Sequence, residues 1–364
     1  MSVVEQAGPV LRSNQLDFDE ETVYEAERHI HDLARSVDER PFCLVVSMTH
    51  PHDPYSTLPE FWDLYRDDEI PLPRVRIDDD DQDPHSRRLQ QVVALRAQEI
   101  DEAMIRRARR GYYGSCSYVD DRMGRLLTLM RRTGLDQNTI TIVLGDHGDM
   151  LGERDLWFKM SWFEDSVRVP LMVHAPWTFA PRRVSEAVSL IDLLPTLCEI
   201  AGDGAAPDYA TPIEGRSLIP HLSGSGGHDE VFGEYMGEGS LAPLLMIRRD
   251  RWKFVTSSPD PDQLFDLAAD PLERTNLTAD PDHADVLAVF RREAAERWDA
   301  ERIREQALAS QRRRRLVHSA LMSGRHQSWD WQPRRAAESA YMRNHRDLDD
   351  VEASARLEPT DRNE

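Results

Sequence analysis

The sequence predicts an α/β protein in which helices cover a mostly parallel sheet, followed by a smaller antiparallel sheet and a carboxyl-terminal tail. Two observations predict this fold class. Short β-branched apolar segments alternate with segments of helical periodicity up to about residue 228. From about residue 230 the pattern changes to closely spaced apolar segments joined by a polar turn. We therefore expect three parts, at 1–228, 229–310 and 311–364.

The composition is that of a globular protein. Its 364 residues are 40% hydrophobic, which suffices for one large domain with attachments or for two domains. No window approaches about 18 consecutive apolar residues, and the first residues lack the basic and apolar regions of a secretion signal. Cys43, Cys116 and Cys198 are too irregularly spaced for a disulfide framework or a cysteine-rich zinc site. We therefore expect a cytoplasmic protein without a membrane anchor.

The charge of the chain restricts its partners. The formal net charge of −21 argues against nucleic acid and anionic membranes, because both need a basic surface. A cationic substrate is compatible with it. Among the 45 basic residues only Lys159 and Lys253 are lysines, so the chain uses arginine almost everywhere. Because a lysine ammonium can approach one oxyanion as a point charge, Lys159 is a candidate for contacting an anionic group.

The first 228 residues supply the alternating elements. Helical spacing of apolar residues predicts helices, and β-branched apolar runs predict strands that helices bury on both faces. The expected helices are 18–39, 87–110, 117–133, which ends at Gly134, and 188–202, which kinks or begins near Pro195. The expected strands are 41–48, 139–145 and 167–176. The acidic run at 77–83 lacks the ligand spacing of a calcium loop, so we expect a solvated loop there.

The later part of the chain begins with an apolar segment at 230–236 and a predicted hairpin at 241–257. Two apolar halves of the hairpin flank the polar turn at 248–251, which is typical of a small antiparallel sheet. An amphipathic helix is expected over 282–310 and runs into four consecutive arginines. The tail carries tryptophans and acidic residues, so we expect it either to pack on the surface as an arm or to hold a quaternary ammonium group.

Acidic and histidine side chains follow two of the predicted strands. Asp146 and His147 come directly after one strand, and His52 lies in a proline-rich loop after another. Because ligands collect beyond the carboxyl ends of strands in an α/β sheet, we expect these side chains to converge near Lys159. Asp146 and His147 could bind a divalent cation, and His52 could donate to an anionic oxygen. The same residues could instead cap and support turns, and spacing alone leaves both interpretations open.

Three stretches of the chain resemble a known family. "SMTHPHDPY" at 47–55, "GDHGDMLGERDLWFKMSWFEDSVRVPLMVHAP" at 145–176 and "QLFDLAADPLERTNL" at 263–277 are similar to motifs of the sulfatases of the alkaline-phosphatase superfamily, in the same order and with similar spacing. The segments 12–26 and 328–356 more narrowly resemble the choline-sulfatase branch. The resemblance implies an alkaline-phosphatase-like fold and metal-assisted hydrolysis of a sulfate ester, with choline sulfate as the substrate.

The resemblance also implies roles for individual residues. Asp146 and His147 would be two ligands of a divalent cation, calcium by this resemblance. His52 and Lys159 would contact the sulfate ester, whose transferring sulfuryl group is stabilised mainly by charge. The nucleophile of this family is a formylglycine hydrate made from a cysteine in a Cys-X-Pro/Ala-X-Arg setting.

The choline end of the substrate would be bound by acidic residues. In choline-sulfatases the tail reaches the site of a neighbouring subunit, so the resemblance implies a homo-oligomer in which Asp349 or Asp350 acts across the interface. Glu234 and Glu238 are further candidates for binding the same cation.

The sequence departs from the family at the nucleophile. None of its three cysteines stands in the Cys-X-Pro/Ala-X-Arg setting, so no nucleophile or formylglycine is expected in this chain. Asp120 and Asp121 could be mistaken for the acidic metal ligands of the family, but their spacing fits the solvated face of a helix. The chain thus resembles about the carboxyl-terminal two-thirds of a choline-sulfatase.

Several functions are consistent with this pattern. The chain could be a sulfuric ester hydrolase by descent, encoded by a truncated gene model or by one half of a split gene. In that case we expect it to be inactive alone. It could be a remnant or subunit without catalysis. A phosphodiesterase or phosphonate hydrolase of the same superfamily is a third possibility, against which the choline-type tail argues.

Overall fold

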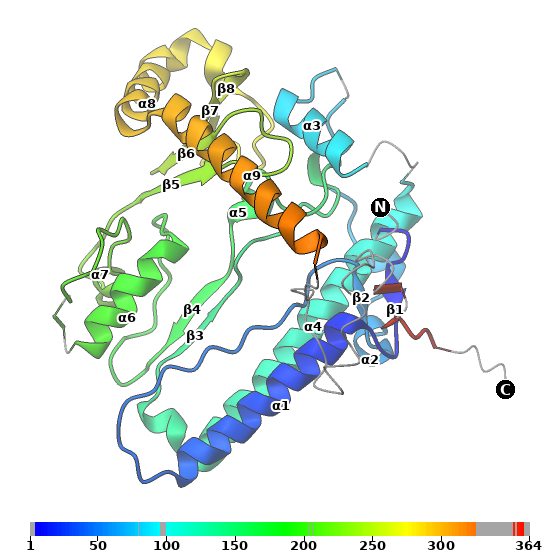
Figure 1. Ribbon diagram of the computed structural model, residues 1–364, viewed down its shortest axis with the longest axis vertical. Coiled ribbons are helices and arrows are strands. Elements are labelled where there is room, and N and C mark those ends of the chain that lie inside the picture. The colour runs from blue at the N-terminus through cyan, green and yellow to red at the C-terminus, as the bar shows by residue number, and fades with distance from the viewer. Residues whose placement is uncertain are drawn as a thin grey trace. The chain divides into compact units, whose positions relative to one another are not determined.

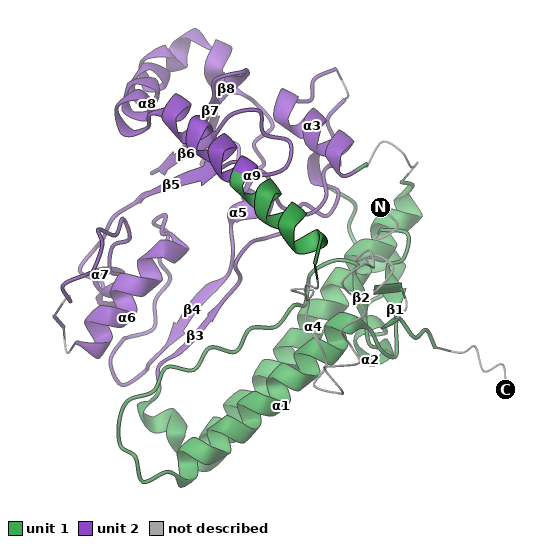
Figure 2. Cartoon of the chain, viewed as in Figure 1, with its two compact units in different colours: residues 1–73, 94–139, 313–364 green, residues 74–93, 140–312 purple. Residues whose placement is uncertain are grey.

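The computed structural model describes residues 4–78, 80–94, 100–202, 204–205, 207–324, 352–353 and 355–359. The chain forms two compact units, which Figure 2 shows in different colours. Unit 1 comprises residues 1–73, 94–139 and 313–364, and unit 2 comprises residues 74–93 and 140–312. The two units are described separately below.

Two long helices, α1 and α4, run side by side in unit 1 (Figure 1). Helix α1 spans Asn14–Arg35 and begins where the Ser13 hydroxyl accepts a hydrogen bond from the backbone N–H of Leu16. Helix α4 spans Glu102–Thr133 and ends at Gly134, whose left-handed conformation (φ 75°) caps the helix as expected. Buried residues of both helices, including Leu16 and Tyr118, form the core between them.

The expected boundaries of the helices 87–110 and 117–133 were wrong. Residues 102–133 form one continuous helix, whereas 84–92 belong to the separate helix α3 (Pro84–Val92) of unit 2. Helix α4 includes Gly111 and Gly114, where other segments of unit 1 approach the helix closely. A Cβ atom on Gly111 would lie 2.0 Å from the Tyr55 carbonyl oxygen, and one on Gly114 would lie 2.8 Å from Thr57 Cγ2. Asp120 and Asp121 are exposed on α4, as expected.

Short backbone ladders complete unit 1. Strand β1 (Gly8–Pro9) pairs in parallel with β2 (Ser56–Thr57), next to the short helix α2 (Pro59–Trp62). The described part of the tail also joins this region. Leu11 N–H donates to the Leu357 carbonyl at 2.7 Å, and Leu357 N–H donates to the Arg12 carbonyl at 2.9 Å. The Arg356 guanidinium donates to the Ser56 hydroxyl at 2.7 Å.

The buried strand expected at 41–48 was wrong. Residues 41–48 form no strand, and most of their side chains are exposed or half-buried, with Val45 80% exposed. The apolar run pairs with no strand among the described residues. A β-branched composition predicts a strand only where a neighbouring strand supplies the hydrogen bonds.

Unit 2 contains a two-stranded ladder. Strand β3 (Thr141–Leu144) pairs antiparallel with β4 (Leu171–His174), which confirms strands in both expected segments. The connection between the two strands folds back as a loop that contains the 3-10 helix Glu153–Asp155 and the four-residue helix α5 (Glu164–Val167). The described sheets are therefore one parallel pair in unit 1, this antiparallel pair and the small sheet described next.

The expected antiparallel sheet is present with its predicted turn. Strands β5 (Glu230–Tyr235), β6 (Leu244–Arg249), β7 (Trp252–Ser257) and β8 (Asp260–Asp266) pair in chain order. Helix α8 (Ala284–Arg297) packs its buried residues Leu287 and Phe290 against this sheet.

The single helix expected over 282–310 is broken. Helix α8 ends before the buried Trp298, and α9 (Ala300–Met322) begins after Asp299, whose carboxylate accepts from Arg302 N–H at 3.0 Å. The remaining helices are α6 (Leu193–Ala201), with Pro195 in its first turn as expected, and α7 (Ile219–Ser223). No helix among the described residues is long and apolar enough to cross a membrane. The three-part division of the chain stays a prediction.

Candidate active site

Asp146 and His147 lie directly after strand β3 in unit 2. The Asp146 side chain is 85% exposed, and its Oδ1 accepts the backbone N–H of His147 at 3.0 Å. His147 Nδ1 lies 2.8 Å from the Gly148 carbonyl oxygen, which can only accept a hydrogen bond. The proton of a neutral His147 ring therefore sits on Nδ1, and Nε2 carries the lone pair. This Nε2 lies 3.8 Å from Asp146 Oδ2.

This arrangement fits two ligands of a divalent cation. A carboxylate oxygen and a ring nitrogen lie near each other, and a backbone carbonyl fixes the tautomer, as is usual for metal-binding histidines. The described residues contain no group of three or more His, Cys, Asp or Glu side chains placed to hold a metal. Asp146 and His147 are therefore too few for calcium, which takes about six to eight oxygen ligands.

Lys159 lies in a strained loop between Asp149 and Phe163. Five residues of this loop that are not glycine adopt left-handed backbone conformations, with φ between 45° and 66°. They are Leu151, Arg154, Asp155, Phe158 and Met160. Such conformations cost roughly 1–3 kcal/mol each and persist only where surrounding contacts hold them. Concentrated strain of this kind is typical of functional loops.

The loop around Lys159 is packed and hydrogen-bonded. Asp149 Oδ1 accepts the N–H groups of Leu151 at 2.9 Å and Phe158 at 3.1 Å, which closes the loop on itself. Met150 is fully buried in a cluster with Leu89 of α3 and Phe265 of β8. Lys159 is half-buried within this largely buried segment.

Glu238 lies in the electrostatic field of Lys159. Glu238 Oε2 accepts a hydrogen bond from the Tyr235 hydroxyl at 2.8 Å. The backbone N–H of Glu238 and the Tyr235 hydroxyl, together with the charge of Lys159, lower the pKa of Glu238. Glu234 is placed differently, because its Oε1 accepts the indole N–H of Trp298 at 2.7 Å. Of the two glutamates proposed from the sequence, Glu238 is thus the one associated with Lys159.

His52 lies in unit 1, in the loop before β2. Its side chain is 35% exposed, and Nδ1 lies 2.7 Å from Asp53 Oδ1 and 3.1 Å from the Asp53 carbonyl oxygen. The loop is joined to α4, because Gly111 lets the Tyr55 carbonyl approach that helix. His52 is thus a polar, accessible group on a well-supported loop.

Sequence reasoning missed the carboxylate that supports the His52 loop. Asp19 of α1 is completely buried and accepts the N–H groups of Thr49 at 2.6 Å and His50 at 3.1 Å. His50 Nδ1 lies 2.7 Å from Asp19 Oδ2, and His50 Nε2 lies 3.2 Å from the Ser56 carbonyl. The signal was present, because Asp19 falls on the buried stripe of α1 with Leu16 and Val23.

The expected convergence of the site residues is only partly described. Asp146, His147, Lys159 and Glu238 belong to unit 2, whereas His52 belongs to unit 1. Asp349 and Asp350 lie outside the described residues, as do the tryptophans of the tail. The gathering of all these residues around one substrate stays a prediction.

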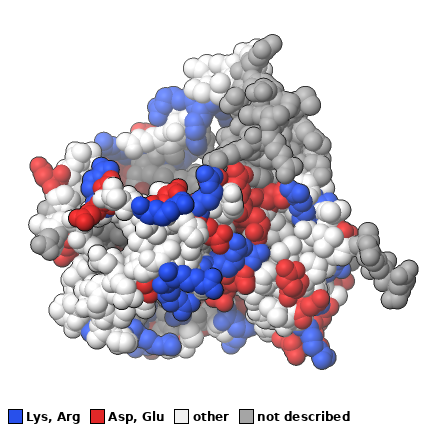
Figure 3. All heavy atoms as spheres, turned by 90° about the horizontal axis from the view of Figure 1, so that it is seen from below, with Lys and Arg blue, Asp and Glu red and all other residues white. Residues whose placement is uncertain are grey.

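The described surface carries both signs of charge. Figure 3 shows one face, on which both basic and acidic side chains occur.

Three family models match the chain. A sulfatase model matches residues 6–203, a model of the N-sulphoglucosamine sulphohydrolase carboxyl terminus matches 152–299, and a model of the choline sulfatase carboxyl terminus matches 305–357. The first two overlap across the Lys159 loop.

Individual proteins are also similar to the chain. A choline-sulfatase of Rhizobium meliloti is 42% identical over 358 residues, which cover 96% of this chain and 69% of that protein. An arylsulfatase of Clostridium perfringens is 27% identical over 266 residues, covering 71% of this chain and 54% of that protein.

Solved structures share the fold. Phosphonate monoester hydrolases of Silicibacter pomeroyi and Agrobacterium radiobacter match with TM-scores of 0.65 and 0.63 at 25% identity. Each alignment covers 76% of this chain, and 59% and 60% of the two hydrolases. The chain thus spans about half to two-thirds of the length of these relatives.

Proposed function

This chain belongs to the sulfatase family, and we propose that it carries part of the active site of a choline-sulfatase-type sulfuric ester hydrolase. The reaction converts choline sulfate and water into choline and sulfate. The observation that carries the proposal is the 42% identity over 96% of the chain to a choline-sulfatase. The match of residues 305–357 to a choline sulfatase carboxyl-terminal model supports the same substrate class.

Lys159 and His52 would contact the sulfate group. A point charge from Lys159 and a hydrogen bond from His52 would stabilise the sulfuryl oxygens as negative charge develops on them. Because Nδ1 of His52 faces the Asp53 oxygens, the donor to the sulfate group would be Nε2 of the charged imidazolium ring. The packed loop fixes the backbone on both sides of Lys159, so little reorganisation is needed during the reaction. The strain of this loop supports a functional role for its geometry.

Asp146 and His147 would hold a divalent cation, which we propose is calcium. The cation would neutralise charge on the sulfate group when it is bound. With only these two ligands, we expect the chain by itself to bind calcium at about millimolar strength. Calorimetry that measured micromolar affinity for the chain would contradict this ligand assignment.

The choline group would be bound by aromatic and acidic side chains. Tyr235 and Glu238 supply one aromatic ring and one carboxylate near Lys159. Cation–π contacts of a quaternary ammonium are worth about 0.5–2 kcal/mol each. We propose that Asp349 or Asp350 of a neighbouring subunit completes this site, with Glu234 as a further acidic group, and that the enzyme is a cytoplasmic homo-oligomer.

Hydrolysis also needs a nucleophile. The 364 residues contain no cysteine in the Cys-X-Pro/Ala-X-Arg setting, and Cys43 and Cys116 are exposed surface thiols. We therefore expect the chain alone not to turn over choline sulfate. Loss of a nucleophile lowers rates by several orders of magnitude.

Complementation tests this proposal. The chain is co-expressed with the part of the Rhizobium meliloti choline-sulfatase to which it does not align, and choline release from choline sulfate is measured. We expect activity in the mixture and none for the chain alone. Robust sulfate release by the chain alone, abolished by Lys159→Ala, would show a nucleophile within it and contradict the proposal.

Phosphonate monoester hydrolysis is a second candidate, favoured by the two solved structures at 25% identity. The same mixture is therefore also given a phosphonate monoester. Faster hydrolysis of the phosphonate than of choline sulfate would replace the first proposal by the second. The carboxyl-terminal match favours choline sulfate.

A further inference from the structure

A buried ion cluster lies next to the Lys159 loop in unit 2. The Lys253 ammonium lies 2.6 Å from Glu164 Oε1 and 2.8 Å from Glu273 Oε1, and it donates to the Trp162 carbonyl at 2.7 Å. Lys253 is 1% exposed and Glu273 is 3% exposed. The other oxygen of Glu273 accepts the backbone N–H of Glu164 at 2.8 Å. Two side chains from the region of the small sheet thereby hold residues 162–164.

The residues held by this cluster follow Lys159 directly, and Glu273 also contacts the earlier part of the loop. The Arg154 guanidinium donates to the backbone carbonyl of Glu273 at 2.8 Å and lies 4.0 Å from the Phe163 ring centre. Glu273 therefore joins the two ends of the strained segment 154–164 that contains Lys159. Strained conformations need such external contacts to persist.

The cluster is also connected to the Asp146 and His147 turn. The backbone N–H of Gly148 donates to the Ser166 carbonyl at 2.7 Å, just beyond the Glu164 anchor. A Cβ atom on Gly148 would lie 2.1 Å from the Asp165 carbonyl oxygen. A displacement of residues 164–166 would therefore move the residue that follows His147.

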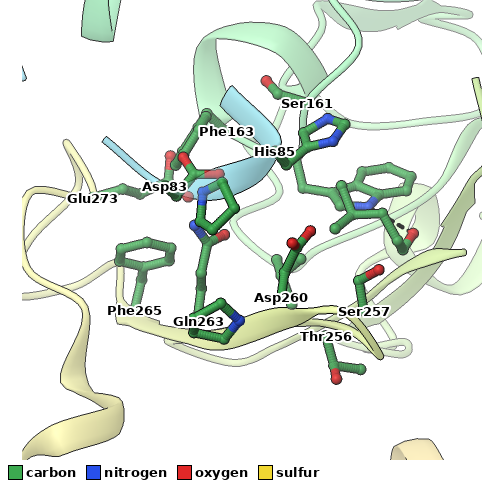
Figure 4. Close-up of a pocket in the computed structure, with 15 residues that line it drawn as sticks. Asp83, His85, Ser161, Phe163, Thr256, Ser257, Asp260, Gln263, Phe265 and Glu273 are labelled. Atoms are coloured by element: carbon green, nitrogen blue, oxygen red, sulfur yellow. Dashed lines mark hydrogen bonds between the residues drawn. The ribbon is translucent and has the colours of Figure 1, made fainter. Parts of the chain in front are cut away.

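The loop also packs on the small sheet through apolar side chains, because Phe163 contacts Phe265 of β8 in a cluster with Met150 and Leu156. Figure 4 shows a pocket lined by Ser161 and Phe163 of the loop, by Glu273, and by residues of β7 and β8 such as Ser257 and Gln263. The alignment of the loop with the sheet therefore has two sources, the apolar contacts of this cluster and the polar contacts of Lys253 and Glu273.

The residue types support a role in alignment. Lys253 is one of two lysines in a chain with 45 basic residues, and its compact ammonium meets three acceptors at once. Burial raises the pKa of Glu273, so its ionised form costs the folded state free energy at neutral pH. Buried ion pairs of this kind are weak sources of net stability, and some are retained for the conformation that they specify.

We propose that Glu273, together with Lys253, is a positioning residue that fixes Lys159 and the Asp146 and His147 turn through residues 162–166. The catalytic part of this inference rests on the proposed function, whereas the structural part does not. Neither residue is proposed to contact the substrate.

Lysine spectroscopy tests the structural part on the full chain. Lysine labelled with ¹³C at Cε gives two side-chain signals, because the chain has only two lysines. Lys159→Arg assigns them. Glu273→Gln keeps the side-chain volume, but its amide has one oxygen where the carboxylate had two, so Lys253 and the Glu164 N–H must share one acceptor. We expect the Lys159 signal to shift or broaden in this variant, together with the Lys253 signal. An unchanged Lys159 signal would overturn the proposal.

Amide hydrogen exchange supplies the second measurement. We expect exchange in residues 154–166 to accelerate about 10-fold in Glu273→Gln, because a buried donor has lost its acceptor. Amides of β6 and β7 should keep their protection. An equal loss of protection in the loop and the strands would show a merely structural role and overturn the proposal. Glu273→Gln is preferred to Lys253→Met, because the latter leaves the carboxylates of Glu164 and Glu273 close together without a cation and is expected to hinder folding.

Arg251→Gln is the matched control. Arg251 is also on the β6–β7 hairpin and pairs with Asp266 through Nε at 2.7 Å, but it makes none of the contacts to residues 162–166 described above. We expect it to leave the Lys159 signal and the loop exchange unchanged. An equal response in this control would also overturn the proposal.

Kinetics of the complemented enzyme test the catalytic part. We expect Glu273→Gln to lower kcat for choline sulfate by about 10- to 100-fold with a smaller change in KM, since small misplacement of a catalytic group is costly. An unchanged kcat would overturn that part. If no variant and no wild-type mixture hydrolyses choline sulfate, the proposed function fails, while the spectroscopic and exchange results still decide the positioning role.

Discussion

The His52 loop of unit 1 and the Lys159 loop of unit 2 are supported in different ways. The His52 loop is fixed by Asp19, which lies about thirty residues before it and binds the backbone of Thr49 and His50. The Lys159 loop is fixed by Glu273 and Lys253, which lie far later in the chain. Asp19 and Glu273 are both buried carboxylates, but Asp19 is a local anchor 30 residues from Thr49, whereas Glu273 lies 109 residues after Glu164 and acts together with Lys253 of β7.

This difference teaches how each loop depends on the rest of the protein. The described contacts of the His52 loop come from α1, β2 and α4 of the same unit. The Lys159 loop reaches its strained conformation only when the antiparallel sheet has formed and brought Lys253 and Glu273 to it. A substitution at one anchor should therefore disturb its own loop and leave the other loop unchanged.

The largest effect is expected for the local anchor. Asp19→Ala removes the acceptor of two backbone N–H groups and the partner of the buried His50 ring. We expect unit 1 to lose about 3–5 kcal/mol of stability, measured by hydrogen exchange of α4. The control Asp17→Ala breaks a surface pair with Arg12 and should cost less than about 1 kcal/mol. Equal losses of stability in Asp19→Ala and Asp17→Ala would contradict the proposed importance of the buried Asp19 contacts.

The second prediction compares the two loops in catalysis. In the complemented enzyme, Lys159→Ala and His52→Ala should each lower kcat by about 10²–10³-fold, because each removes a donor to the sulfate group. If both contact one sulfate, the double variant should lose less than the product of the single losses. Losses that multiply fully would indicate that the two loops serve separate sites. Arg28→Ala, on the exposed face of α1, is the control.

The third prediction concerns the glycine that lets the His52 loop approach α4. Gly111→Ala places a methyl group against the Tyr55 carbonyl and should cost about 1–3 kcal/mol by overpacking. Gly124→Ala is the matched variant on the same helix, where a Cβ atom meets nothing within 4 Å. It should instead stabilise by about 0.5–1 kcal/mol. Thermal denaturation measures the stability of both variants. A loss of stability in both would contradict the role of Gly111 as the point of close approach.

The smallest effects are the pH dependences of two carboxylates near the small sheet. Hydrogen bonds from Arg251 lower the pKa of Asp266 below its ordinary value of 3.8. The stabilisation from this pair is therefore present above pH 3.8 and is lost as the pH falls further. Burial raises the pKa of Glu273 above 4.5, so its contribution is largest below that pH and declines as the pH rises.

Urea denaturation at several pH values measures these opposite signs. The destabilisation by Arg251→Gln should shrink on acidification, whereas Glu273→Gln should gain stability relative to the wild type as the pH rises above 4.5. The same sign for both variants would contradict the assigned causes.

Much of the fold could be predicted from local patterns. The spacing of apolar residues predicted α1, and the polar turn at 248–251 predicted the β6–β7 hairpin, because both depend on neighbours in sequence. The apolar run at 41–48 did not form a strand, since a strand depends on a partner that local sequence does not specify. The helical break at Trp298 was missed for the same kind of reason, because a tertiary contact with Glu234 holds that indole.

The site was predicted less completely than the fold. Motifs identified Asp146, His147, His52 and Lys159, but their roles rest on resemblance and their convergence is untested. The anchors Asp19 and Glu273 were missed because both are ordinary acidic residues whose importance comes from burial. An acidic residue on the apolar stripe of α1 and a rare lysine within an apolar strand were the available signals.

The pairing of Leu357 with Leu11 and Arg12 has a consequence for synthesis of the protein. Unit 1 contains both early and late residues of the chain, and unit 2 lies between them in sequence. On the ribosome, α1 and α4 emerge before most of unit 2, yet the backbone of residues 11 and 12 cannot pair with Leu357 until that residue has been made. Unit 2 is translated entirely within that interval, so a nascent chain can complete unit 2 before it completes unit 1.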